Sequence, residues 1–321
     1  MGSTTPLSSS TSSNSDDTVV ELSTPRNQKI ILVGTGHMSR KSQEEVQAVI
    51  QQVQPNMVLV ELDASRLPRI GIDGIQGIQV DRVVTAAEDI LATSDEAEDT
   101  GFNLVAWWQR TFLVGFSKIA RTWLTSMYDG MRDRQKLVQS KLDANEVIPG
   151  GEMLVAIRAA EQCPACDTVV LGDRSSVKTI QRAAQLAWDS GDALGLLRRL
   201  QSENQAVVKE LRARVCVDLG LDDSNGITKE DEAVLEMEVM EALRNDSQVR
   251  DRLFQRLEER VPEFTQAFLK ERDLIMGESI RRELEREGVE RVVAVVGLAH
   301  VPGIRNILEA SFASLPTTKS Q

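Results

Sequence analysis

Histidine, cysteine and aromatic residues are scarce in this sequence. The 321 residues include 2 His, 3 Cys and 1 Tyr, and aromatic residues make up only 4%. Three cysteines cannot build a disulfide framework, so we expect a reducing compartment. Cys163 and Cys166 have the spacing of a redox pair, but they precede an apolar run instead of following one, and only Cys216 remains for a zinc site. We interpret this segment as a loop with two small residues.

Basic residues are also in short supply. The chain has 37 Lys and Arg against 49 Asp and Glu, which gives a net charge of −12. A field of that sign repels phosphate backbones, so the composition argues against nucleic acid as a partner. The content of hydrophobic residues, 41%, is that of a soluble globular protein with a sizeable buried core.

Long apolar runs are missing as well. No segment reaches the about 18 uncharged apolar residues that a membrane-spanning helix requires. The nearest is 103–124, which is rich in tryptophan but interrupted by basic residues. Trp108, Phe112 and Phe116 recur there at four-residue steps and line one face of a predicted helix. We expect this face to be buried, either in a homodimer or within one monomer; peripheral association with a membrane surface is the alternative.

The first 28 residues lack both apolar content and a targeting signal. They are rich in Ser and Thr, so we expect a disordered tail over 1–28 and a second flexible tail over 313–321. A secretory signal needs a basic start and an apolar stretch, and a transit peptide avoids the acidic residues found here. We therefore expect a cytoplasmic protein.

Four short runs rich in Val, Ile and Leu predict buried strands. Because these runs are continuously apolar, they are typical of a parallel sheet covered on both faces. The runs are residues 29–34, 57–61, 168–172 and 291–297.

Helical patterns follow three of these runs. Ser42 and Glu45 predict a capping box, Ser175 predicts a second helix cap, and Pro302 suits a first helical turn. The pattern predicts the α/β class, with a mostly parallel sheet flanked by helices. We place one domain over residues 29–312, with large helical insertions at about 71–162 and 190–288.

Polar residues gather where the predicted strands end. Both histidines follow a strand at the same Gly-x-x spacing: His37 in LVGTGH and His300 in VVGLAH. Parallel strands end at one edge of a sheet, which is where ligands bind in this class, and we expect the glycines to allow tight turns there. The other two strands lead into Glu61, Asp63, Arg66, Asp173 and Arg174.

Two histidines and nearby carboxylates are the ligands of a first-row metal site. We predict a divalent metal held by His37, His300, Glu61 and Asp173; manganese, cobalt and zinc are all compatible. Glu61 would be a ligand or a general base, and Arg174 would stabilise an oxyanion. A single histidine at a strand end is more often structural, so the repeated motif carries this prediction.

Five segments, in this order, resemble the TraB/PrgY family, which belongs to a wider group with the GumN-like proteins and the Tiki proteases. They are GTGHMSRKSQEEVQAVIQQVQPNMVLVELDASR, GGEMLVAI, LGDRSSVKTIQRA, LKERDLIM and VVGLAHVPGI. The resemblance covers about residues 29–312. It implies an α/β fold with helical insertions and, for the Tiki branch, a metal-dependent peptidase that requires two Gly-x-x-His motifs and an acidic residue.

The required residues of the Tiki branch fall on His37, His300 and Glu61. The remaining motif positions, which the resemblance places along the same cleft, are Glu152, Asp173, Arg174, Arg182, Glu271 and Arg272. We therefore predict a metal-dependent hydrolase that acts on peptides or proteins. The alternative is a non-catalytic peptide-binding or regulatory protein, because the bacterial branch is associated with peptide-pheromone shutdown. Eukaryotic members of the family imply the mitochondrial outer membrane as a second location, although this sequence ends without an apolar anchor.

Overall fold

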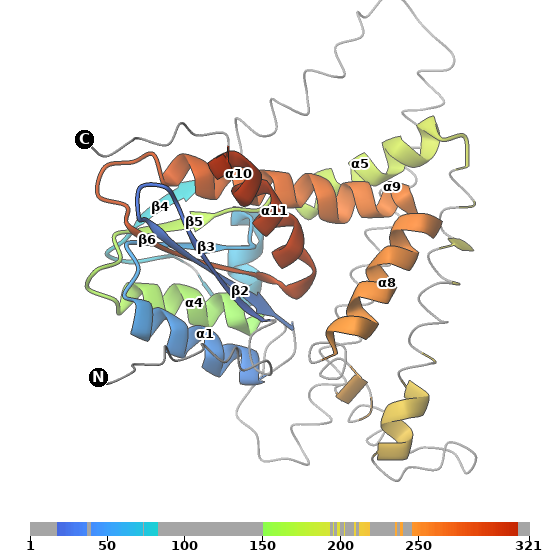
Figure 1. The fold of residues 1–321 in the computed structure, drawn as a ribbon, viewed down its shortest axis with the longest axis horizontal. Helices are drawn as coiled ribbons and strands as arrows, with labels where there is room; N and C mark the ends of the chain where they lie inside the picture. Colours follow the sequence, from blue (N-terminus) through green and yellow to red (C-terminus); the bar gives the residue numbers. More distant parts are fainter. Residues whose placement is uncertain are drawn as a thin grey trace, which may run out of the picture.

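The computed structural model describes residues 18–36, 40–72, 74–82, 150–192 and 246–313, together with a few helical positions between 195 and 239 (Figure 1). His37 and the predicted helix at 103–124, with its homodimer face, lie outside these residues. Among the described helices, none has both the length and the apolar character needed to cross a membrane.

One mixed sheet of six strands forms the centre of the described structure, in the order β1-β2-β6-β3-β5-β4. Every neighbouring pair is parallel except β1 and β2, which are antiparallel. The predicted α/β class and all four predicted strands are confirmed. The strands are β1 (Val19–Ser23), β2 (Lys29–Thr35), β3 (Met57–Val60), β4 (Gln79–Arg82), β5 (Thr168–Leu171) and β6 (Arg291–Gly297).

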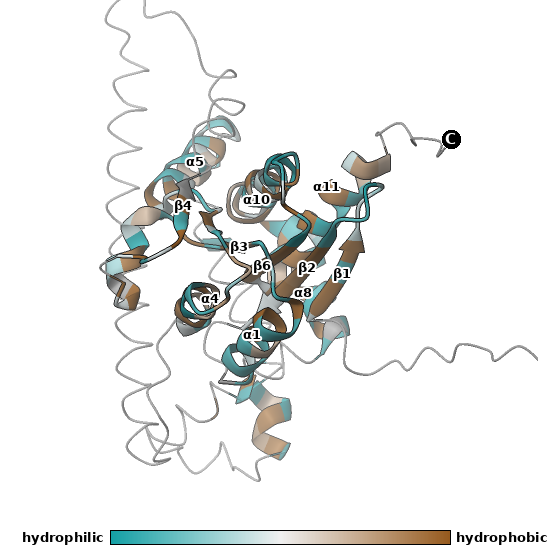
Figure 2. Cartoon of the chain, turned by 90° about the vertical axis from the view of Figure 1, so that its left-hand side faces the viewer, coloured by the Kyte–Doolittle hydropathy of each residue, from teal (hydrophilic) through white to brown (hydrophobic). Residues whose placement is uncertain are grey.

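Helices cover both faces of the sheet, as Figures 1 and 2 show. On one face lie α1 (Arg40–Val53) and α4 (Gly151–Glu161), and on the other lie α10 (Glu271–Glu283) and α11 (Val301–Ala313). Ile31 and Val33 of β2 join the core on the α1 and α4 side. Ile30 and Leu32 join the core on the other side. Both faces of the strand are buried, which explains its continuous apolar sequence.

The remaining described elements extend the fold beyond the two helical layers. The consecutive elements α9, η3 and α10 form one helical stretch, in which η3 is a single π turn. The further elements are η1 (Ala64–Ile70), α5 (Ser176–Asp189), α8 (Ser247–Arg260), α9 (Pro262–Thr265), η3 (Gln266–Lys270) and η4 (Leu298–His300).

The structure differs from the sequence prediction at both edges of the sheet. β1 lies within the segment assigned to the disordered tail, and β4 lies within the insertion that begins at about residue 71. An edge strand pairs with one neighbour only and needs less apolar surface. Of the five residues of β1, only Leu22 is fully buried, so the continuous apolar run that marks a central strand is absent.

The predicted helix starts are partly confirmed. Ser175 caps α5 by accepting a hydrogen bond from the Val177 amide, and Pro302 lies in the first turn of α11. The capping box at Ser42 is wrong, because α1 already begins at Arg40. The Ser42 hydroxyl instead accepts a hydrogen bond from the amide of Gly36 at 3.1 Å and ties the helix to the end of β2.

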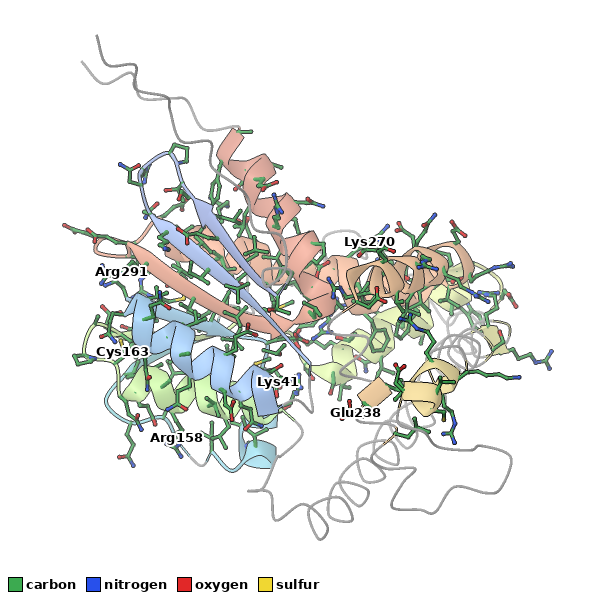
Figure 3. All side chains as sticks on the ribbon, turned by 60° about the horizontal axis from the view of Figure 1, so that its bottom comes forward. Lys41, Arg158, Cys163, Glu238, Lys270 and Arg291 are labelled. Carbon is green, nitrogen blue, oxygen red and sulfur yellow. The ribbon has the colours of Figure 1, made fainter. Side chains whose placement is uncertain are left out.

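Cys163 and Cys166 lie in the turn between α4 and β5, as the sequence predicts. Both thiols are free and buried, and burial raises the pKa of Cys166 to about 12. Figure 3 shows Cys163 near Arg291, the first residue of β6, at the amino end of the sheet. A thiol with so high a pKa is unreactive at neutral pH.

Gly34, at the end of β2, serves close packing instead of the tight turn that we expected. Among the described glycines, positive φ angles occur at other positions, and φ at Gly297 is −58°. A Cβ atom at Gly34 would lie 2.5 Å from Leu298 Cδ1 and 2.8 Å from Val301 Cγ2. Gly34 is therefore needed because the turn after β6 packs directly against the end of β2.

We predict that Gly34→Ala lowers the free energy of unfolding by about 1–3 kcal/mol, since the added methyl group overpacks this contact. Gly74→Ala is the matched control, because a Cβ atom there meets no heavy atom within 4 Å. Urea denaturation followed by circular dichroism measures both. Equal stability of the two variants would show that the turn is loosely packed.

Candidate functional site

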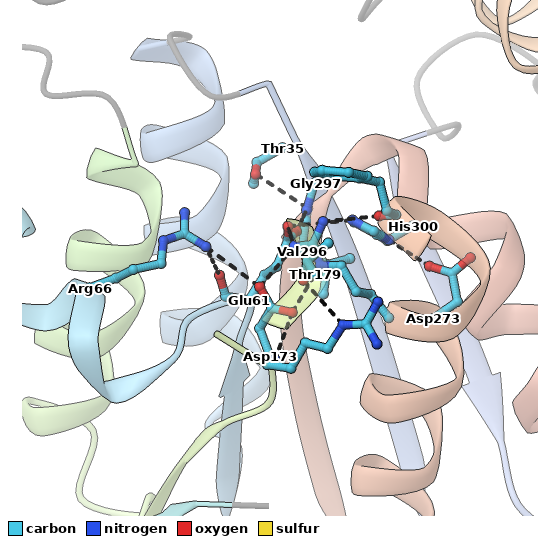
Figure 4. Close-up of polar contacts among 12 residues, drawn as sticks. Thr35, Glu61, Arg66, Asp173, Thr179, Asp273, Val296, Gly297 and His300 are labelled. Carbon is cyan, nitrogen blue, oxygen red and sulfur yellow. Dashed lines mark hydrogen bonds and ion pairs between the residues drawn. The ribbon is translucent and has the colours of Figure 1, made fainter. Parts of the chain in front are cut away.

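The carboxyl ends of β3, β5 and β6 bring three predicted site residues together (Figure 4). Glu61 directly follows β3, Asp173 lies two residues after β5, and His300 lies three residues after β6. The Glu61 amide donates to the Val295 carbonyl at 3.1 Å. One oxygen of the Glu61 carboxylate, Oε2, accepts a hydrogen bond from the Gly297 amide at 2.5 Å.

The imidazole of His300 is held between two carboxylates. Its Nδ1 lies 2.5 Å from Asp273 Oδ1, and its Nε2 lies 3.4 Å from Glu61 Oε1. The three side chains are all buried. The bond to Asp273 fixes the orientation of the ring, so that Nε2 points at Glu61.

The two carboxylates keep His300 protonated in the metal-free protein. Burial by itself lowers the pKa of His300, but the charge of Glu61 and the hydrogen bond to Asp273 outweigh it and raise the pKa to about 9. Burial also raises the pKa of Asp273. At neutral pH the ring is therefore an imidazolium between two acidic groups.

Gly303 makes room for the contact between Asp273 and His300. Asp273 comes from the first turn of α10, whereas His300 immediately precedes α11. A Cβ atom at Gly303 would overlap the carboxylate of Asp273. The glycine in the VPGI segment thus allows the two helices to approach closely enough for the carboxylate to reach the ring.

Arg272 bridges the carboxylates that follow β3 and β5. Its Nη2 contacts Glu61 Oε1 and lies 2.8 Å from Asp173 Oδ2, and its Nε lies 2.9 Å from Asp173 Oδ1. The Arg174 amide also donates to Asp173 Oδ1. Burial lowers the pKa of Arg272, but the charges of Glu61 and Asp173 outweigh this and raise it, so the guanidinium stays charged. Both carboxylate oxygens of Asp173, a predicted metal ligand, accept hydrogen bonds from Arg272 in this structure.

Arg174 and Arg182 share a different carboxylate, that of Glu271. Arg174 Nη1 lies 2.8 Å from Glu271 Oε2, and Arg182 Nε lies 2.9 Å from Oε1. Arg174 also donates through Nε to Thr179 Oγ1 and through Nη2 to the Ala267 carbonyl. The three guanidinium nitrogens of Arg174 thus bind one group each in α5, α10 and the π turn. These contacts do not support the oxyanion role that we predicted for Arg174.

Three consecutive residues in the first turn of α10 each bind a different set of partners. Glu271 binds Arg174 and Arg182, Arg272 binds Glu61 and Asp173, and Asp273 binds His300. The π turn before them presents carbonyls to the same arginines: Phe268 O accepts from Arg272 Nη1 at 3.1 Å. π turns of this kind are frequent at functional sites.

Asp273 was missed by the sequence reasoning, although it follows Glu271 and Arg272 in the quoted segment LKERDLIM. Glu152, another predicted site residue, is buried in the first turn of α4, on the sheet face opposite α10. His37 lies outside the described residues, and the structure describes the chain before it only as far as residue 36. The Thr35 hydroxyl donates to the Val296 carbonyl at 3.2 Å, which fixes the end of β2 beside that of β6.

His300 and Glu61 have a spacing that fits two ligands of one metal ion. Their facing atoms, Nε2 and Oε1, are 3.4 Å apart, and donors bound tetrahedrally at about 2.1 Å lie about 3.4 Å from each other. Within the described residues, no group of three His, Cys, Asp or Glu side chains is arranged to hold a metal. His37, the third ligand predicted from the sequence, lies outside the described residues.

A mostly parallel sheet between helices, with a buried carboxylate–histidine pair at its carboxyl edge, defines an α/β protein with a candidate polar site. The model of the TraB/PrgY/gumN family matches residues 151–311, half of the chain. The chain therefore belongs to the TraB/PrgY/gumN family, as the sequence motifs predict. The match includes Asp173, the first turn of α10 and His300, whereas Glu61 lies before it. A comparison with curated proteins found no significant match.

We predict that His300 titrates near pH 9 in chelator-treated protein, well above the ordinary value of about 6.5. Because the pKa is raised on folding, protonation of His300 stabilises the fold fully below about pH 6.5, and this stabilisation is lost as the pH rises through about 9. Nitrogen-15 NMR of the imidazoles measures the titration, and His300→Gln assigns the signal. A midpoint near 6.5 would show that the two carboxylates do not hold the ring.

Proposed function

We propose that the protein is a metal-dependent hydrolase that acts on peptides, with His300, Glu61 and His37 as metal ligands. One observation carries the proposal: the Nδ1 atom of the buried His300 is bound to Asp273, and its Nε2 atom faces Glu61. Ligand histidines in metalloproteins are oriented in this way by a carboxylate on the other ring nitrogen.

A divalent metal at this position would lower the pKa of a bound water and polarise a peptide carbonyl. The protein supplies the orientation of the ligands. Asp273 fixes the ring of His300, and the Gly297 amide fixes Glu61 through Oε2, so Oε1 is the oxygen turned toward His300. Arg272 also contacts Oε1, so a bound metal would compete with the guanidinium for this atom.

The second candidate is a peptide-binding regulatory protein without catalysis. It is favoured by Arg272, which forms ion pairs with both Glu61 and Asp173. Charges that are paired and hydrogen-bonded in this way are stable without a metal. A protein that only binds peptides would retain this arrangement.

We predict that His300→Ala abolishes stoichiometric binding of manganese, cobalt or zinc. Asp273→Asn should weaken it by about 10–100-fold, the usual cost of losing the carboxylate behind a ligand histidine. Calorimetric titration and elemental analysis measure both effects. Glu309→Gln, which removes an exposed partner of Arg305, is the control and should bind normally. Equal metal content in the wild type and His300→Ala would refute the proposed ligand set.

Peptide cleavage separates the two candidate functions. We expect the metal-loaded protein to create new termini in a mixed peptide library, as detected by mass spectrometry. Both His300→Ala and a chelator should stop this. Retention of peptides without cleavage identifies the binding protein, and cleavage that persists in chelator contradicts the metal mechanism.

A further inference from the structure

We propose that Arg66 binds a carboxylate of the ligand, so that the site selects peptides with a free C-terminus or an acidic side chain. This inference rests on the proposed peptide ligand but not on a metal or on hydrolysis. It names the chemical class of peptide that the carboxyl edge of the sheet accepts.

In the cluster of ion pairs at this edge of the sheet, the arginine Arg66 is more exposed to solvent than the carboxylates. The side chains of Glu61 and Asp173 are 5% and 3% exposed, whereas that of Arg66 is 22% exposed. Asp273 and Glu271 are likewise buried. A ligand that reaches this edge therefore meets guanidinium groups before it meets carboxylates, although the whole protein has a net charge of −12.

Arg66 has hydrogen-bond donors to spare. Its Nη1 lies 3.3 Å from the Glu61 carbonyl oxygen and 3.5 Å from Asp173 Oδ2, both at the long end for such contacts. Nε and Nη2 have no partner in the part of the chain that the structure describes. Arg174 and Arg272, in contrast, donate through all three of their guanidinium nitrogens.

The two unused nitrogens, Nε and Nη2, are the pair that binds a carboxylate side-on. Arg272 uses the same pair in this site, with Nε 2.9 Å from Asp173 Oδ1 and Nη2 2.8 Å from Oδ2. Two parallel N–H···O bonds of this kind select a planar carboxylate. Arg66 can bind a ligand carboxylate in the way that Arg272 binds Asp173.

The backbone at Arg66 is fixed beside the candidate catalytic groups. Arg66 lies in η1, where Asp63 accepts a hydrogen bond from the Ser65 amide at 2.8 Å and Gly71 ends the element in a left-handed conformation. Figure 4 shows Arg66 and His300 on opposite sides of Glu61. A peptide whose carboxylate is bound by Arg66 would therefore extend past Glu61 toward His300.

The test is calorimetric binding of three probes to chelator-treated full-length protein. The probes are acetyl-tetra-alanine with a free C-terminus, the same peptide with a C-terminal amide, and an amidated peptide with one internal Asp. We expect at least one carboxylate probe to bind about 10-fold more tightly than the neutral amide, as a charged hydrogen bond implies. Tighter binding of the free acid identifies an α-carboxylate, and tighter binding of the Asp peptide identifies a side chain.

Variants tie the preference to Arg66. Arg66→Gln should lose the roughly 10-fold preference for a carboxylate probe over the neutral amide. Arg66→Lys should keep only part of this preference, because lysine retains the charge without the paired donors. Arg158→Gln is the control: Arg158 is exposed and lies with Cys163 and Arg291 at the other end of the sheet (Figure 3). Equal binding of all probes, no binding of any probe, or a preference that survives Arg66→Gln overturns the inference. Since no metal is present, these outcomes are independent of the hydrolase proposal.

Discussion

Neutralisation of buried acids at one edge of the sheet is the constraint on which the rest of this structure depends. An isolated buried charge costs several kcal/mol, so burial is tolerated only with a well-placed partner. Four acids of the network have such a partner: Arg272 pairs with Glu61 and Asp173, and His300 pairs with Asp273. Two further arginines hold Glu271. The network joins β3, β5, β6, α5 and α10, so the same ion pairs that form the candidate site also fix the helices around it.

The backbone is shaped to bring these groups together. Parallel pairing places the ends of β3, β5 and β6 side by side, and glycines allow the next layer to approach. Gly34 admits the turn that contains Leu298, and Gly303 admits the Asp273 carboxylate. The π turn before α10 adds the remaining acceptors, because Ala267 and Phe268 present carbonyls to arginines. Local backbone geometry and ion pairing therefore depend on each other at this edge.

The sequence predicts the central sheet well because four strands are buried on both faces. It does not predict β1 and β4, because edge strands do not need a continuous apolar run. The convergence of Glu61, Asp173 and His300 could be predicted, since parallel strands end at one edge. Asp273 could not be distinguished from a solvated helical residue, because a run of Glu, Arg and Asp usually faces water. The direction of Arg174 depends on Thr179 and Ala267, which are tertiary contacts that spacing along the chain does not reveal.

Our central proposal is that His300 and Glu61 are two ligands of a metal ion, that Asp273 orients His300, and that Arg272 pairs with Glu61 until the metal binds. Anomalous diffraction from crystals grown with manganese or zinc tests it most directly. We predict an anomalous peak about 2.0–2.2 Å from His300 Nε2 and Glu61 Oε1, with Asp273 still bound to Nδ1 and Arg272 displaced from Glu61. A map without a peak at this edge, with Arg272 still bridging Glu61 and Asp173, would contradict the claim.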